Sequence, residues 1–100
     1  NQGHTYHLMP ALYDSSVTNK NRDDLIKLLY EKYNIQCVVQ YYPLYRYPLF
    51  KNRGFGNANC PNTDNFFDNM ISFPFHHSLS EEEFNYLISS VINACKKLRE

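Results

Sequence analysis

The sequence is short of the features that mark several classes of protein. Tryptophan is absent from its 100 residues, glycine occurs only three times, and ten basic side chains are balanced by ten acidic ones. The zero net charge argues against nucleic-acid binding, which usually leaves a clustered basic excess. We find no apolar run long enough to span a membrane and no signal peptide. We therefore expect a cytoplasmic protein that binds neither nucleic acid nor membrane.

Cysteine is also scarce, and its spacing excludes the usual metal sites. The three cysteines, Cys37, Cys60 and Cys95, lie far apart in the sequence. A structural zinc site needs clustered ligands such as a C-x-x-C pair, and none is present. We interpret the three as reduced, mostly buried thiols and predict no metal ligand in this chain.

The length and the 43% hydrophobic content predict one globular domain with a modest core. Because the chain starts at Asn1 and enters a strand-like segment almost at once, we expect it to be a piece of a longer protein. Apolar residues follow strand and helix periods along the chain. The predicted elements are strands at residues 4–13, 35–42 and 70–75, a helix between the caps Asn21 and Asn34, a short helix from Pro61, and a long helix opened by a Ser80–Glu83 capping box.

Strands and amphipathic helices in this order predict a two-layer α/β sandwich. We expect a small sheet of three to four strands with the helices packed on one side. Pro10 marks the first strand as an edge strand, because proline has no N–H to donate to a neighbour. The last helix carries one apolar stripe, which we expect to face the core: Phe84, Leu87, Ile88, Val91, Ile92, Cys95 and Leu98.

The segment VVQYYPLYRYPLF, residues 38–50, is the most informative part of the chain. Four tyrosines and Arg46 fall within seven residues, between a predicted buried strand and a second proline. A phenol suits a place where one end is apolar and the other is wet. The composition therefore indicates the wall of a ligand site or an interface, although packing in the core or a dimer interface explains the tyrosines equally well.

Local motifs do not give a reaction. No cysteine sits in a catalytic signature, and adjacent His76 and His77 point to opposite sides of an extended segment, where a surface position is favoured over a metal site. The Gly54–Gly56 pair lacks the lysine and the strand-to-helix context of a phosphate-binding loop. No pair of carboxylates stands out for acid–base chemistry. From the residues alone, we predict an α/β domain with a wall rich in tyrosine and arginine.

Several short motifs, in order, give the chain a family resemblance. They are His7-Leu8, Arg22-Asp23-Asp24-Leu25, Val39 to Tyr45, Cys60-Pro61, Ser72-Phe73-Pro74 and Leu79 to Glu83. With these motifs the chain resembles the C-terminal small domain of the DegT/DnrJ/EryC1/StrS family, which are pyridoxal phosphate (PLP)-dependent nucleotide-sugar aminotransferases. The resemblance covers essentially all 100 residues. It differs at Gln40 and Tyr45, where the family often has histidine.

The resemblance implies the small domain of a fold type I PLP enzyme, at the C-terminal end of a longer chain. In this family the lysine and aspartate that hold PLP belong to an upstream large domain, and no lysine here matches that motif. The resemblance therefore implies a full-length homodimer that uses PLP and acts on a keto sugar nucleotide in amino-sugar biosynthesis for lipopolysaccharide, glycans or antibiotics. It also implies that the isolated chain binds no PLP and is inactive.

The site expected from the resemblance consists of substrate-binding residues, with no catalytic, cofactor-binding or metal-binding residue. These candidates are His7, Tyr42, Tyr45 and Arg46. Arg46 could pair with a diphosphate or with the carboxylate of an amino donor, or it could be a solvated loop charge. Two other functions stay open: PLP-dependent sugar dehydration within the same family, and a stand-alone binding or interaction domain.

Overall fold

The structure, a computed structural model, describes Gly3 and residues 7–100. Two strands and several helices make up this part of the chain. In order they are β1 (Met9–Leu12), the 3-10 turn η1 (Ser15–Val17), α1 (Arg22–Tyr33), the 3-10 turn η2 (Leu44–Arg46), α2 (Pro48–Phe50), the π-helical turn η3 (Lys51–Phe55), α3 (Pro61–Asn69), β2 (Met70–Phe73) and α4 (Glu81–Leu98).

The two principal helices begin and end where local side chains cap them. Asn21 and Asp24 form a capping box at the start of α1, and Ser80 and Glu83 form another at the start of α4. Asn34 ends α1 in the left-handed conformation, with φ 57° and ψ 37°, which asparagine adopts more readily than most residues. These predicted caps are confirmed.

The sheet in the described residues is a two-stranded antiparallel pair, β1–β2, with Met9 opposite Phe73 and Leu12 opposite Met70. β1 is an edge strand, with no strand of the described residues on its other side to accept a hydrogen bond. Pro10, which has no backbone N–H, can therefore lie opposite Ser72 without loss of a hydrogen bond on that side. The predicted mixture of helices and a small sheet is confirmed, with two strands in place of the expected three to four. The predicted first strand started at His4, and residues 4–6 lie outside the described part of the chain.

The predicted strand at residues 35–42 is reduced to a single bridge. Val38 and Ser72 exchange backbone hydrogen bonds of 3.1 and 2.8 Å on the side of β2 that is turned away from β1. Two residues later the N–H of Gln40 donates to the Met70 sulfur at 3.4 Å, and no backbone carbonyl of β2 receives it. Pairing with β2 therefore ends after Val38, and the chain leaves the sheet.

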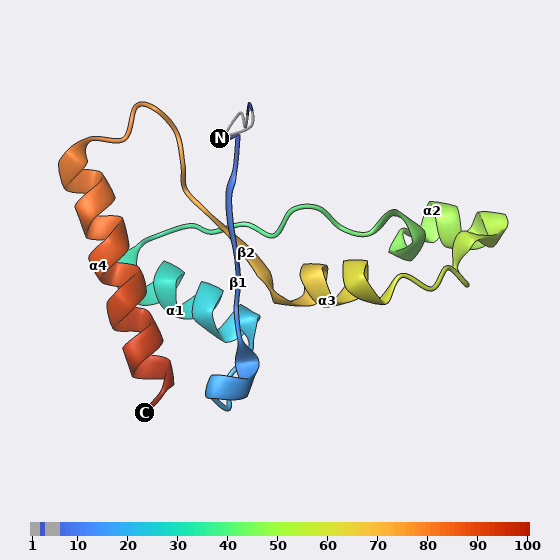
Figure 1. The fold of residues 1–100 in the computed structure, drawn as a ribbon, viewed down its shortest axis with the longest axis horizontal. Coiled ribbons are helices and arrows are strands. Elements are labelled where there is room, and N and C mark those ends of the chain that lie inside the picture. Colours follow the sequence, from blue (N-terminus) through green and yellow to red (C-terminus); the bar gives the residue numbers. More distant parts are fainter. Residues whose placement is uncertain (1–2, 4–6) are drawn as a thin grey trace.

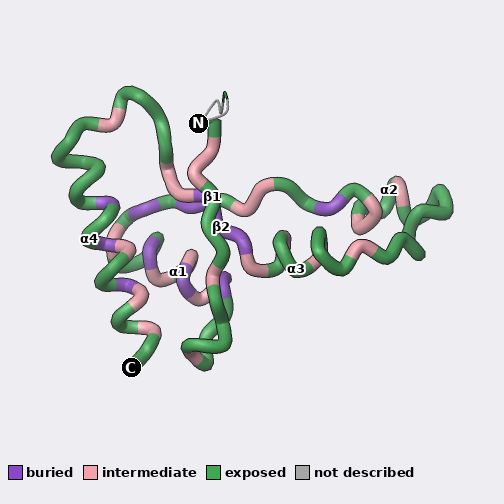
Figure 2. The backbone as a smooth tube through the Cα atoms, in the orientation of Figure 1, coloured by how far each residue is buried: buried purple, intermediate pink, exposed green. Residues whose placement is uncertain are grey.

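The core lies where α1 and α4 pack on β2. Its most buried members come from all three elements and from the segment after α1: Leu25, Leu29, Ile35, Cys37, Ile71, Leu87 and Ala94. Figure 2 shows most of the buried residues in this region, where α1 approaches both α4 and β2. We call this part of the molecule, residues 7–40 and 70–100, the hub.

The apolar stripe predicted on α4 is only half covered. Leu87 is buried, and Val91, Cys95 and Leu98 pack against the core. Phe84, Ile88 and Ile92 are 39%, 42% and 49% exposed, so the prediction that the whole stripe faces the core was wrong for them. The hub presents too little apolar surface to α4 to cover an apolar stripe of this width.

Residues 41–69 form an arm that projects from the hub, as Figure 1 shows to the right of the β-strands. The arm runs outward through η2, α2 and η3 and returns through α3. Gly54, with φ 95°, lies at the outer turn, in a conformation that most side chains disfavour. Only Pro43 is buried in this stretch. The arm explains a radius of gyration of 16.0 Å, against about 13 Å for a compact chain of this length.

Candidate functional site

The tyrosine-rich segment forms two short turns in the part of the arm that runs away from the hub. Pro43 accepts the N–H of Arg46 at 3.0 Å, and Leu44 accepts that of Tyr47 at 3.1 Å, which closes η2. Pro48 then starts α2 at the first helical position, where its missing N–H costs nothing. Residues 43–50 thus consist of a 3-10 turn followed by a single helical turn. These turns hold Tyr45 and Arg46 beside each other and facing α3.

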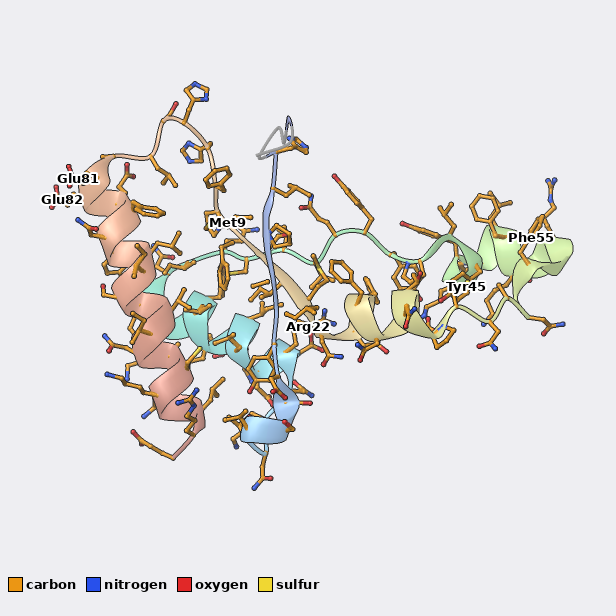
Figure 3. The ribbon with its side chains drawn as sticks, in the orientation of Figure 1. Met9, Arg22, Tyr45, Phe55, Glu81 and Glu82 are labelled. Atoms are coloured by element: carbon orange, nitrogen blue, oxygen red, sulfur yellow. The ribbon has the colours of Figure 1, made fainter. Side chains whose placement is uncertain are left out.

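The returning helix α3 meets them with an acidic face. Asp64 and Asp68 lie one turn apart and therefore share one side of the helix. Arg46 donates from Nη2 to Asp64 Oδ1 at 2.7 Å and from Nη1 to Asp68 Oδ1 at 3.1 Å. The Tyr45 hydroxyl donates to the same Asp64 oxygen, and the carbonyl of Cys60 lies farther away at 3.4 Å. In Figure 3, Tyr45 lies between the outgoing and returning limbs of the arm.

The hydrogen bonds of this cluster stabilise the neutral form of Tyr45 and the charged forms of Asp64 and Arg46. The hydrogen bond to Asp64 raises the pKa of the Tyr45 phenol to about 12. The same bond, followed by the contact with Arg46, holds the pKa of Asp64 below its ordinary value of 3.8. The bonds to Asp68 and Asp64 raise the pKa of Arg46 further. At neutral pH the cluster therefore contains a neutral phenol, one guanidinium and two carboxylates.

Phe67 is the apolar centre of the same site. The Arg46 guanidinium carbon lies 5.3 Å from its ring centroid, within the range of a cation–π contact. Tyr42 meets the same ring edge-on at 5.3 Å and meets Tyr47 at 4.9 Å. The three aromatic rings thus pack edge to face along the arm. Tyr42 stays 43% exposed, so one face of this wall is open.

Arg22 anchors the arm to the hub. Its Nη1 donates to the carbonyl oxygens of Phe67 at 2.7 Å and Met70 at 2.9 Å, which lie at the junction of α3 and β2. Its guanidinium carbon also lies 5.7 Å from the Phe67 ring centroid. Arg22 is 9% exposed, and Figure 3 shows it where α1 meets the base of the arm. The start of α1 therefore fixes the position of α3, and through it the position of Tyr45 and Arg46.

The structure brings together three of the four predicted site residues. Tyr42, Tyr45 and Arg46 converge on Phe67 and Asp64, whereas His7 is an exposed residue just before β1, in the hub. Sequence reasoning missed Asp64 and Asp68 as partners of Arg46. The available signal was the spacing of Asp64, Phe67 and Asp68, which places all three on one face of a short helix.

The described residues do not fit the role of holding PLP. A lysine that binds PLP must be activated by burial or by its neighbours, and every lysine of this chain is exposed.

Among residues 7–100 there is also no group of three His, Cys, Asp or Glu side chains arranged to hold a metal ion. Within that same part of the chain, no helix combines the length and the apolar character needed to cross a membrane. The site offers hydrogen-bonding and charged groups that can bind a ligand.

Comparison with known proteins gives consistent matches. The model of the DegT/DnrJ/EryC1/StrS aminotransferase family matches residues 1–92. The chain is 27% identical over 94 residues to the spore coat polysaccharide biosynthesis protein SpsC of Bacillus subtilis (strain 168), covering 93% of this chain and 24% of that protein.

Two solved structures share the fold. One is a putative sugar aminotransferase, Spr1654 from Streptococcus pneumoniae, in its PMP form, with a TM-score of 0.78 and 33% identity over 92% of this chain and 23% of that one. The other is Helicobacter pylori PseC, an aminotransferase involved in the biosynthesis of pseudoaminic acid, with a TM-score of 0.79 and 26% identity over 91% of this chain and 24% of that one. The chain spans about a quarter of the length of the relatives it matches.

Proposed function

This chain belongs to the DegT/DnrJ/EryC1/StrS aminotransferase family, and we propose that it is the single C-terminal small domain of a PLP-dependent aminotransferase. The proposed enzyme transfers an amino group to a keto sugar carried on a nucleotide, in a cytoplasmic pathway of amino-sugar biosynthesis. The observation that carries this proposal is the family match over residues 1–92, at a length that is about a quarter of the matched relatives. The fold agreement with two sugar aminotransferases supports it.

Within that enzyme, the chain's task is to position the substrate. When bound, PLP supplies an electron sink for moving an amino group, and the lysine that holds it lies outside these 100 residues. The isolated chain is therefore inactive. Tyr42 offers an aromatic face and a hydroxyl, and Tyr45 and Arg46 offer hydrogen-bonding groups on the same side of the arm. His7, which is exposed in the hub apart from these three residues, contributes a further hydrogen-bonding group.

The exposed surface of the arm supports a neighbour in the whole protein. Tyr41 and Leu44 are 69% and 67% exposed, and Leu49 and Phe55 are each 59% exposed. Figure 3 shows Phe55 at the outer end of the arm, far from the hub. Apolar side chains in such a number are usually covered by another surface. We propose that the upstream PLP domain and the second subunit of a homodimer cover them.

The first experiment is to read the gene upstream of Asn1, express the full-length protein and assay it. We expect a large domain with a lysine in a PLP site, the absorbance of bound PLP, and amino transfer from glutamate to a keto sugar nucleotide. A histidine in place of that lysine, together with loss of a sugar hydroxyl, would establish dehydration instead. A reading frame without such a domain, with sugar-nucleotide binding by the chain itself, would establish a stand-alone binding domain.

The substrate-binding residues have their own test in the full-length enzyme. Tyr45→Phe and Arg46→Ala should each raise KM for the sugar nucleotide, because each change removes a hydrogen-bonding group from the arm. Unchanged kinetics in both variants would show that these side chains only support the fold.

A further inference from the structure

The cluster at the arm has the wrong charge for binding an anion. Arg46 was a candidate to pair with a diphosphate, yet each of its two terminal nitrogens already donates to a carboxylate. One guanidinium and two carboxylates leave the cluster with a net negative charge. A phosphate that approached Arg46 would meet both carboxylates at short range, and like charges placed together at an interface repel each other. The bidentate fork that makes arginine a good phosphate ligand is also taken.

The direction of the hydrogen bonds points to the kind of group that fits. An ionised carboxylate accepts only, so the single proton of the Tyr45 hydroxyl is committed to Asp64. The phenol oxygen is left as an acceptor, and Asp64 and Asp68 are acceptors as well. An ionised diphosphate has no proton to donate to any of them. A sugar hydroxyl has one, and it can also accept from the remaining N–H groups of Arg46.

We infer that the cluster of Tyr45, Arg46, Asp64 and Asp68 recognises the uncharged, hydroxyl-bearing sugar of the substrate and leaves the diphosphate to other residues. Tyr45 accepts a hydrogen bond from a sugar hydroxyl, and Arg46 donates to a neutral oxygen. Asp64 and Asp68 are positioning residues, which act by fixing the Tyr45 proton and the Arg46 guanidinium. The inference rests on the proposed function, since it refines the substrate contact of the same site.

Equilibrium binding tests this inference without depending on catalysis. A uridine or thymidine diphosphate sugar and the matching nucleoside diphosphate are titrated into the full-length protein by calorimetry. For Tyr45→Phe we expect the Kd of the sugar nucleotide to rise by roughly five- to tenfold, the usual effect of losing one hydrogen bond. The Kd of the nucleoside diphosphate should stay within about twofold.

The Asp64→Asn variant distinguishes the role of Asp64 in positioning the Tyr45 hydroxyl from the effect of its negative charge. The amide can present its NH2 group to the phenol oxygen as well as its carbonyl oxygen to the phenol proton, so the direction of the Tyr45 hydrogen bond is no longer fixed and the sugar nucleotide should bind more weakly. The site also loses one negative charge, so the nucleoside diphosphate should bind as well as before or better. A merely structural effect would weaken both ligands together. Tyr86→Phe is the matched control, because it removes a hydroxyl that donates to the Tyr33 carbonyl in the hub, and both ligands should bind to it as to the wild type.

Two results would overturn the inference. A rise in the Kd of the nucleoside diphosphate that matches the rise for the sugar nucleotide would place the diphosphate at this cluster. Weaker binding of glutamate, with the sugar nucleotide unaffected, would assign the cluster to the ammonium group of the amino donor. A protein that binds the sugar nucleotide but transfers no amino group would refute the proposed aminotransferase activity alone, and the binding comparison would still stand.

Discussion

Arg22 gives the sharpest prediction about what holds the arm in place. Its two hydrogen bonds to the carbonyls of Phe67 and Met70 have a charged donor, and such bonds contribute about 1.5–3 kcal/mol each. Burying the guanidinium costs part of that gain. We therefore expect Arg22→Met, which keeps the aliphatic volume, to lower the free energy of opening of the α3–β2 junction by about 3 kcal/mol.

Hydrogen exchange in the full-length protein measures this opening locally. A loss of about 3 kcal/mol corresponds to exchange that is faster by a factor of roughly 150 in peptides that cover residues 61–73. Asp23→Ala is the control. It breaks the ion pair of Arg22 with Asp23, whose side chain is 74% exposed, and so should cost less than about 1 kcal/mol. Equal protection in Arg22→Met and Asp23→Ala would refute the idea that Arg22 anchors the arm.

Three further predictions concern the hub. Leu29 is fully buried, so Leu29→Ala should cost about 2–5 kcal/mol by hydrogen exchange of α1, and the exposed Leu12→Ala should cost far less. The backbone N–H of Ser80 holds the pKa of Glu83 below its ordinary value of 4.5, so protection of the first turn of α4 should persist above that pH and fall as the pH drops through the lower, folded-state pKa. Corrected for intrinsic exchange, this dependence should vanish in Glu83→Gln. Burial raises the pKa of Cys37 to about 11, so at pH 8 its alkylation should be roughly a hundredfold slower than that of a free cysteine peptide, and comparable rates by mass spectrometry would contradict its burial.

The features that the sequence predicted well depend on neighbours only a few residues away. Asn21, Asn34 and Ser80 were all identified as caps, because a cap is satisfied within its own turn. Pro61 at the start of α3 follows the same logic. The clustering of Tyr42, Tyr45 and Arg46 was also foreseeable, since they are close in the chain and a short turn keeps them together.

Features that depend on distant segments were not predictable in this way. The segment at residues 35–42 was predicted as a strand, but how far it pairs depends on where the chain leaves β2, and only the Val38–Ser72 bridge forms. The period of α4 shows which residues share a face and not how much of that face the hub can cover. Asp64 reaches Arg46 only because the chain reverses around Gly54, and no local pattern gives the distance after that reversal.

The antiparallel pairing of β1 with β2 constrains the order in which the chain can fold. Met9 must find Phe73, so the first strand has no partner in this sheet until the whole arm has been synthesised. Closing so long a loop is entropically unfavourable unless other contacts share the cost, and pairings between distant residues slow folding. On the ribosome, Met9, which packs against the core in the folded chain, has no partner strand in this sheet until β2 emerges, so chaperones can bind this segment during synthesis.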